Sequence, residues 1–175
     1  ELSLTNLHPV KWGNQLYNYS AQPAKFTGAN GPDDLLGGSA NDTLIPGEGD
    51  DTIGTSTGRD TIIFADDFGH DSLIGDGADD IWDFSATKTG VVGTVDSKTG
   101  GKLTSGSNSI DIVSGIANTY YMGSGNDDLH VNGLGGQTVT VTDAGGNDKY
   151  QFGIGSASNT HVTVTNAKPS EGFDQ

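Results

Sequence analysis

Four aspartates, Asp33, Asp42, Asp51 and Asp60, stand nine residues apart. Glycines precede each of them, and glycine lets the backbone turn with a positive φ that exposes carbonyl oxygens. Carboxylate and carbonyl oxygens are the ligands of Ca²⁺, which binds them at about 2.3–2.6 Å, whereas Mg²⁺ keeps its waters and needs a tighter octahedron. The array therefore predicts loops that hold a hard cation, with calcium favoured over magnesium.

The elements that must position these aspartates are short strands. An aliphatic residue follows each aspartate by two positions, at Leu35, Leu44, Ile53 and Ile62. Nine residues suffice for a tight loop and a three-residue strand, which is half of a flattened coil. A full coil then takes two repeats, so loops n and n+2 stack on one edge about 4.8 Å apart. An ion midway between two stacked loops reaches oxygens of both. We therefore expect an all-β protein, a right-handed parallel β-roll with calcium between its loops.

Composition supports this fold class and excludes several functions. The 175 residues include 28 Gly, 20 Asp and no Cys, and Asp and Gly are poor helix formers. Eight basic residues against 23 acids give a net charge of −15. Binding to a phosphate backbone needs the opposite sign, so we expect no nucleic-acid partner. No apolar run approaches the ~20 residues of a membrane-spanning helix, and we expect no membrane insertion.

The organisation of the chain changes along its length. We expect the aromatic-rich first segment to cover the open end of the solenoid, and the repeat to become looser after a segment rich in Gly, Ser, Thr and Lys. The chain lacks an initiator Met, so we expect a module of a larger parent protein with flanking domains. The predicted segments are an N-terminal cap (1–27), a calcium-binding nonapeptide β-roll (28–85), a loop or hairpin insertion (86–109), a second, irregular β-roll block (110–166) and a frayed tail (167–175).

The stretch Gly37-Gly38-Ser39-Ala40-Asn41-Asp42-Thr43-Leu44-Ile45 resembles the nonapeptide G-G-x-G-x-D-x-U-x of RTX, or hemolysin-type, calcium-binding repeats. The resemblance covers residues 28–83 well and 110–152 more weakly. It implies a parallel β-roll, Ca²⁺ between the loops, and type I secretion from a bacterium to the cell surface or the extracellular space. The ligands that it implies are Asp33, Asp42, Asp51, Asp60, Asp71, Asp79, Asp127 and Asp148.

The other polar residues predict no second chemistry. Gly54-Thr55-Ser56-Thr57-Gly58 matches the G-x-S-x-G of hydrolases, but that motif needs a strand before it and a helix after it. The four histidines show no zinc spacing. We therefore expect no catalytic residue and no enzymatic activity. The acids outside the repeat frame are expected to be solvated: Asp34, Asp50, Asp66, Asp67, Asp76, Asp80 and Asp128.

The function expected from the sequence is calcium-dependent folding and stiffening of an extracellular protein. About four to six Ca²⁺ ions would offset most of the negative charge. Two alternatives stay open. The module could be the scaffold of an adhesin or surface-layer protein that binds a cell-surface or glycan ligand through segment 86–109. It could also be the non-catalytic C-terminal domain of a secreted protease, lipase or polysaccharide-modifying enzyme.

Overall fold

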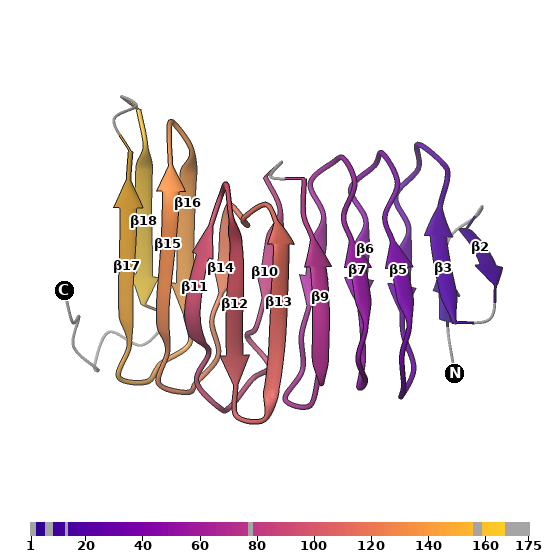
Figure 1. The fold of residues 1–175 in the computed structure, drawn as a ribbon, viewed down its shortest axis with the longest axis horizontal. Helices are drawn as coiled ribbons and strands as arrows, with labels where there is room; N and C mark the ends of the chain where they lie inside the picture. The colour runs from indigo at the N-terminus through magenta and orange to yellow at the C-terminus, as the bar shows by residue number, and fades with distance from the viewer. Residues whose placement is uncertain (1–2, 6–8, 13, 77–78, 156–158, 167–175) are drawn as a thin grey trace.

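The computed structural model describes residues 3–5, 9–12, 14–76, 79–155 and 159–166. These residues form eighteen strands and no helix, arranged as two facing sheets of a β-solenoid (Figure 1). Among the described residues, no helix is long and apolar enough to span a membrane. The all-β, largely parallel fold predicted from the repeat is confirmed.

The eight-stranded sheet lies behind the other sheet in Figure 1. In spatial order it contains β1 (Ser3–Thr5), β4 (Lys25–Thr27), β6 (Thr43–Ile45), β8 (Thr61–Ile63), β10 (Ile81–Asp83), β14 (Thr119–Tyr121), β16 (Thr138–Asp143) and β18 (His161–Asn166).

The ten-stranded sheet lies in front. In spatial order it contains β17 (Lys149–Ile154), β15 (Asp128–Leu134), β11 (Val92–Asp96), β12 (Gly100–Ser105), β13 (Asn108–Ser114), β9 (His70–Ile74), β7 (Thr52–Gly54), β5 (Asp34–Leu36), β3 (Gln15–Asn18) and β2 (Pro9–Trp12).

Consecutive coils stack in register. Leu35 pairs with Ile53 and Leu44 pairs with Ile62, so each partner lies two repeats further along the chain. Ile53 then pairs with Leu73, a slightly longer step, because eight residues separate Ile63 from Ser72, the partner of Thr52, whereas six separate Ile45 from Thr52. The strands therefore alternate between the two sheets, and loops n and n+2 share an edge, as the nine-residue period predicts.

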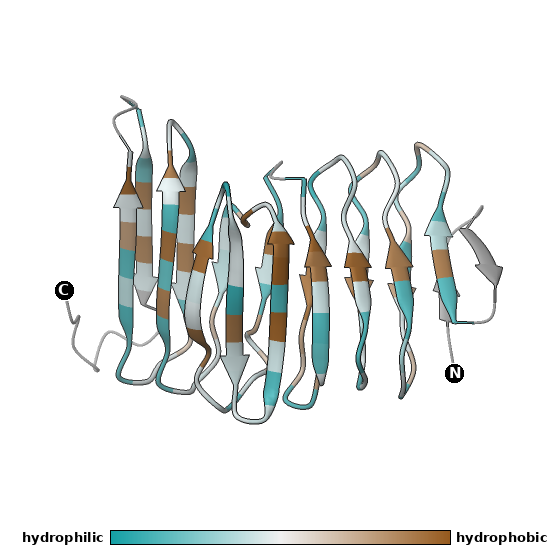
Figure 2. Ribbon diagram, in the orientation of Figure 1, coloured by the Kyte–Doolittle hydropathy of each residue, from teal (hydrophilic) through white to brown (hydrophobic). Residues whose placement is uncertain are grey.

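The core lies between the sheets and contains the aliphatic residue of each repeat. Leu35, Leu44, Ile53 and Ile62 are all 0–1% exposed. The flanking strand residues point outward, since side chains alternate between the two faces of a strand, and Figure 2 shows this alternation as brown and pale bands along the longer strands. Each short strand thus contributes one apolar side chain to the core.

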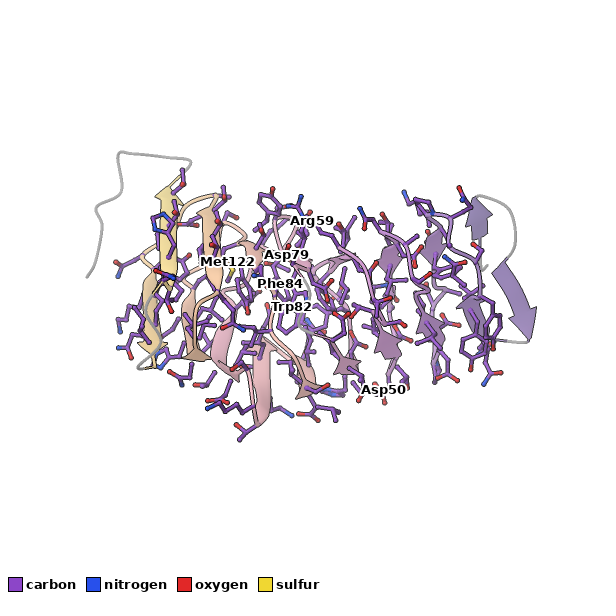
Figure 3. The ribbon with its side chains drawn as sticks, turned by 90° about the horizontal axis from the view of Figure 1, so that it is seen from above. Asp50, Arg59, Asp79, Trp82, Phe84 and Met122 are labelled. Atoms are coloured by element: carbon purple, nitrogen blue, oxygen red, sulfur yellow. The ribbon has the colours of Figure 1, made fainter. Side chains whose placement is uncertain are left out.

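Segment 86–109 widens the front sheet. Strand β12 is antiparallel to both β11 and β13, so three strands of the ten-stranded sheet stand where the other sheet has only β14. Large side chains fill this part of the core: Phe64 stacks on Phe84 at 4.8 Å, and Trp82 meets Tyr120 edge-on at 5.5 Å. Figure 3 labels Trp82 and Phe84 in this middle region. Strands β11 and β12 of this segment therefore form an antiparallel hairpin that belongs to the front sheet.

The N-terminal end is covered by antiparallel strands. Strand β1 pairs with β4, and β2 pairs with β3. Strands β3 and β4 are themselves parallel to β5 and β6, so the first coil already lies within the segment 1–27 that was expected to be a cap. The tail predicted for 167–175 lies outside the described residues.

Candidate metal centre

The repeat aspartates occupy the two edges of the solenoid. Each stands directly before a strand or at its start, so it closes the loop that leads into that strand. Strands β5, β7 and β9 begin at the lower edge in Figure 1. Asp33, Asp51 and Asp71 stand at the starts of these strands and therefore belong to the lower edge. Asp42 and Asp60 stand at the starts of β6 and β8 in the other sheet, and they belong to the opposite, upper edge.

Main-chain hydrogen bonds link the aspartates of each edge into a column. On the lower edge, the Asp33 N–H donates to Oδ1 of Asp51 at 2.8 Å, and the Asp51 N–H donates to Oδ1 of Asp71 at 3.0 Å. On the upper edge, the Asp42 N–H donates to Oδ1 of Asp60 at 2.6 Å. Each of these coils therefore places a carboxylate against the coil before it.

The upper column continues at Asp80 instead of Asp79. The Asp60 N–H donates to Oδ1 of Asp80 at 2.9 Å, and Asp80 is 1% exposed. Asp79, which the repeat frame selected, is exposed and has a φ of 40°; it is labelled in Figure 3. The expectation that Asp80 is solvated is wrong. Its carboxylate is buried because the next inward residue, Trp82, fixes the strand register.

The column carboxylates are buried, and four of the six have an oxygen without a hydrogen-bond donor. The aspartates of both columns are 0–3% exposed. Asp42 accepts three hydrogen bonds. The Ala24 N–H and the Asn18 side-chain amide donate to its Oδ1, and the Gly38 N–H donates to its Oδ2. By contrast, five buried Oδ2 atoms in the described part of the chain have no donor, and they belong to Asp51, Asp60, Asp71, Asp80 and Asp127.

Burial makes the ionised form of these side chains unfavourable. It raises the pKa of Asp51 and Asp80 to about 6, of Asp60 to about 7 and of Asp71 to about 8. Neighbouring carboxylates raise these pKa values further, whereas the main-chain N–H of the preceding coil lowers them. At neutral pH each column therefore needs protons or cations to compensate its buried charge.

The C-terminal coils contain a second arrangement on the lower edge. Val91 N–H donates to Oδ1 of Asp127 at 2.6 Å, and Asp127 N–H donates to Oδ1 of Asp148 at 2.8 Å. Asp143, at the end of β16, joins this pair. One carboxylate oxygen from each of the three residues lies within 4.8 Å of the others, and all three residues are buried. This buried carboxylate cluster could hold a metal ion.

Sequence reasoning selected Asp127 and Asp148 for this region but missed Asp143. The position of Asp143 in the repeat was the available signal. Asp143 stands five residues before Asp148, and glycine occupies the same position before Asp33 (Gly28) and before Asp42 (Gly37). Tyr150 also belongs to the region, since its hydroxyl oxygen is buried without a hydrogen-bond partner. Burial raises the pKa of Tyr150, and the carboxylates of Asp127, Asp143 and Asp148 add to this effect. Tyr150 follows Asp148 by two residues and pairs with Leu129, which follows Asp127 by two residues.

The remaining acids lie outside these groups. Asp50, Asp67 and Asp76 are exposed or partly exposed, as are Asp34, Asp66 and Asp128. Asp66 forms an ion pair with Lys88 at 3.1 Å, and Asp128 contacts His130 at 2.9 Å. None of these six stands in a column.

The loop backbones fit closely stacked oxygen ligands. Gly31, Gly49 and Gly58 have φ values of 113°, 142° and 126°, a region that other residues rarely adopt. A Cβ atom added at Gly28 would overlap the carbonyl oxygen of Pro46 in the next coil. The backbones of neighbouring loops therefore approach each other without intervening side chains, and at Gly28 both the Pro46 carbonyl oxygen and Asp33 Oδ2 lie close to this position.

Two histidines contact residues other than the serine of the nucleophile-like motif. Ser56 is exposed and has a φ of 63°. His70 contacts Ser109 at 3.0 Å and His130 contacts Asp128, both on strands of the front sheet. Each of these two imidazoles is thus engaged by a residue other than Ser56.

Comparison of the chain with known protein families, with characterised proteins and with solved structures gave no match. The RTX resemblance therefore stays a prediction from sequence, and the function is inferred from the solenoid and its buried carboxylates.

Proposed function

We propose that the protein is a calcium-binding structural module that folds and stiffens when it meets extracellular calcium. One observation carries the proposal: among the described residues, five buried aspartates each have a carboxylate oxygen that receives no hydrogen bond. A buried carboxylate without a compensating partner is costly, and a cation between stacked loops supplies the missing interaction. Several such sites along one stack make folding depend on the cation.

Calcium is the cation that best fits the donors. All candidate ligands are oxygens, and Ca²⁺ accepts six to eight of them in a flexible geometry. Extracellular calcium modules bind with Kd values of about 10⁻⁴–10⁻³ M. A tenfold excess over Kd contributes about 1.4 kcal/mol per site, so four sites would contribute about 5–6 kcal/mol. That is comparable to the stability of a whole domain.

The RTX resemblance supports the wider setting of this proposal. In that setting the chain is a non-catalytic part of a larger bacterial protein, exported by type I secretion and exposed at the cell surface or outside the cell. Its partners are calcium ions and flanking domains. The same resemblance leaves the adhesin scaffold as a second setting for an identical module.

Circular dichroism of the purified chain tests the proposal. After treatment with EDTA we expect a partly disordered spectrum with a strongly weakened β signal, which millimolar CaCl₂ converts to a full β spectrum. An equal concentration of MgCl₂ should leave the β signal weakened. A β spectrum in EDTA that does not change when calcium is added would refute the calcium switch.

A further inference from the structure

The loop between β16 and β17 differs from the repeat loops at its first position. Asp143, the last residue of β16, leads into this loop and Asp148 ends it, so a buried acid stands on each side of the turn. The loops that end at Asp33, Asp42 and Asp51 begin with Gly28, Gly37 and Pro46, whose side chains offer no oxygen. A column site therefore draws one carboxylate from each loop, whereas this loop supplies two.

The preceding coil adds a third carboxylate. Asp127 is 2% exposed, its Oδ1 accepts the Val91 N–H, and its Oδ2 is buried without a donor. The Oδ2 atom therefore has unused acceptor capacity in the cluster where one oxygen from each of the three aspartates lies within 4.8 Å of the others. A cation bound among the three carboxylates would provide the missing interaction for Asp127 Oδ2.

A phenol and a carbonyl complete the donor set. The Tyr150 hydroxyl oxygen is buried and has no hydrogen-bond partner among the described residues. Tyr150 stands two residues after Asp148 and pairs with Leu129, two residues after Asp127, so its backbone adjoins both ligand loops. A Cβ atom added at Gly146 would overlap the carbonyl oxygen of Gly125, so the two loops are in direct backbone contact. All of these groups are hard oxygen donors.

We propose that Asp127, Asp143 and Asp148, together with the Tyr150 hydroxyl, form a separate class of cation site that binds hard divalent or trivalent ions more tightly than the column loops. The inference rests on the proposed function, because it assumes that the column loops bind cations as well. Calcium affinity in proteins rises with the number of charged ligands and the rigidity of the site. The third carboxylate supplies the charge, and strands of six and seven residues hold its loops.

Asp143 also has a local role that the test must separate from cation binding. Its Oδ1 accepts the Gly145 N–H at 2.9 Å, which stabilises the turn. An asparagine retains this carbonyl oxygen and the shape of the side chain but removes the charge. Asp143→Asn therefore tests charge without deleting the turn, and Asp111→Asn is the matched control because Asp111 is an exposed acid on β13.

Terbium luminescence reports on the site selectively, since Tb³⁺ takes oxygen ligands as Ca²⁺ does and a nearby tyrosine transfers excitation to it. The full chain, held folded at the lowest CaCl₂ concentration that circular dichroism shows to be sufficient, is titrated with Tb³⁺ under tyrosine excitation. We expect one tight equivalent that Ca²⁺ displaces at concentrations about tenfold lower than half-saturate the column sites.

The variants then identify the ligands. Asp143→Asn should weaken the tight equivalent about tenfold or more, and Asp111→Asn should leave it unchanged. Tyr150→Phe should remove most of the sensitised emission and leave calorimetric binding of a tight ion detectable. Equal affinities in Asp143→Asn and Asp111→Asn would show that Asp143 only caps the turn and would overturn the inference. Its failure in this way leaves calcium-dependent folding intact, whereas a chain that binds no cation at all refutes the proposed function too.

Discussion

The coils from β5 to β10 and the coils from β14 to β18 have the same two-sheet architecture but differ in strand length and in the number of residues per coil. In the first set, which we call the N-terminal coils, most strands have three residues and successive coils lie about two repeats apart in the chain. In the second set, the C-terminal coils, β15 to β18 have six or seven residues, and the step between paired residues is longer, as from Tyr120 to Val141.

This difference changes the balance between apolar burial and buried charge. An N-terminal strand buries one apolar side chain, such as Leu44, and follows one buried acid. A C-terminal strand such as β16 buries two, Val139 and Val141. Each buried aliphatic side chain contributes roughly 1.5–3 kcal/mol. The N-terminal coils should therefore depend on cations for stability more than the C-terminal coils do.

Removal of calcium should separate the two sets most clearly. In EDTA we expect amide protection in β5, β6, β7 and β8 to fall about 100-fold, which is the loss of two sites at tenfold calcium excess. Protection in β15 and β16 should fall less. Hydrogen–deuterium exchange with mass spectrometry measures both in one sample. Equal loss of protection in all coils would show that the solenoid is one cooperative unit.

Asp51→Asn should have opposite effects with and without calcium. Asp51 lies between Asp33 and Asp71 in the lower column. Loss of its charge therefore impairs two neighbouring sites, at about 1.4 kcal/mol each for tenfold excess. Without calcium the same variant should be stabilised, because a buried charge is removed and the carbonyl acceptor is kept. Thermal melts in CaCl₂ and in EDTA measure both signs.

The matched control is Asp50→Asn, which changes the exposed neighbour of Asp51. We expect its unfolding free energy to stay within about 0.5 kcal/mol of the parent chain in either condition. If the two variants lose calcium affinity equally, bulk negative charge rather than defined ligands attracts the ion.

Acid should partly replace calcium in the cation-free chain. The pKa values of Asp51, Asp60 and Asp71 are raised to between about 6 and 8 in the folded state, from 3.8. The folded state therefore binds more protons between about pH 4 and pH 8, and stability is lost as the pH rises through this window. One pKa unit is about 1.4 kcal/mol, so in EDTA the Tm at pH 5 should exceed that at pH 8 by about 5 °C or more.

The columns identify the origin of this effect. Asp60→Asn should reduce the pH dependence, because its buried side chain no longer titrates. Asp83→Asn, at a partly exposed position on β10, is the control. A cation-free chain that is more stable at pH 8 than at pH 5 contradicts the burial of these carboxylates.

Much of this architecture could be predicted because it is local and periodic. The repeat distance from Asp33 to Asp42 determines both the strand length and the edge on which each loop lies. The aliphatic residue two positions after each aspartate determines which face of the strand packs against the core, and Leu35 and Ile53 are buried as this pattern predicts.

The parts that sequence did not predict depend on contacts between distant segments. The residue composition of segment 86–109 is compatible with a loop or a hairpin. Pairing of β12 with β11 and β13 is what makes it a strand of the sheet. The role of Asp143 depends on Asp127, which lies in another coil. The nine-residue repeat distance alone predicts neither of these contacts.

Asp79 and Asp80 give the smallest predicted effect and the sharpest test of register. Asp79 is exposed with a positive φ, which asparagine tolerates. Asp79→Asn should therefore change stability and calcium affinity by less than about 0.5 kcal/mol. Asp80→Asn removes a buried charge beside Asp60 and should lower calcium affinity as a column variant does. Calorimetry measures the calcium affinity of Asp79→Asn and Asp80→Asn, which carry the same substitution at adjacent positions.

The reverse order of effects would mean that the strand is shifted by one residue, with Ile81 inward and Trp82 outward, since a one-residue slip exchanges the faces of a strand. Trp82 fluorescence in a Trp12→Phe background decides this independently. A buried indole emits at short wavelength and resists acrylamide quenching, as the 0% exposure of Trp82 requires. Emission at long wavelength that acrylamide quenches readily would place Trp82 on the outer face and return Asp79 to the column.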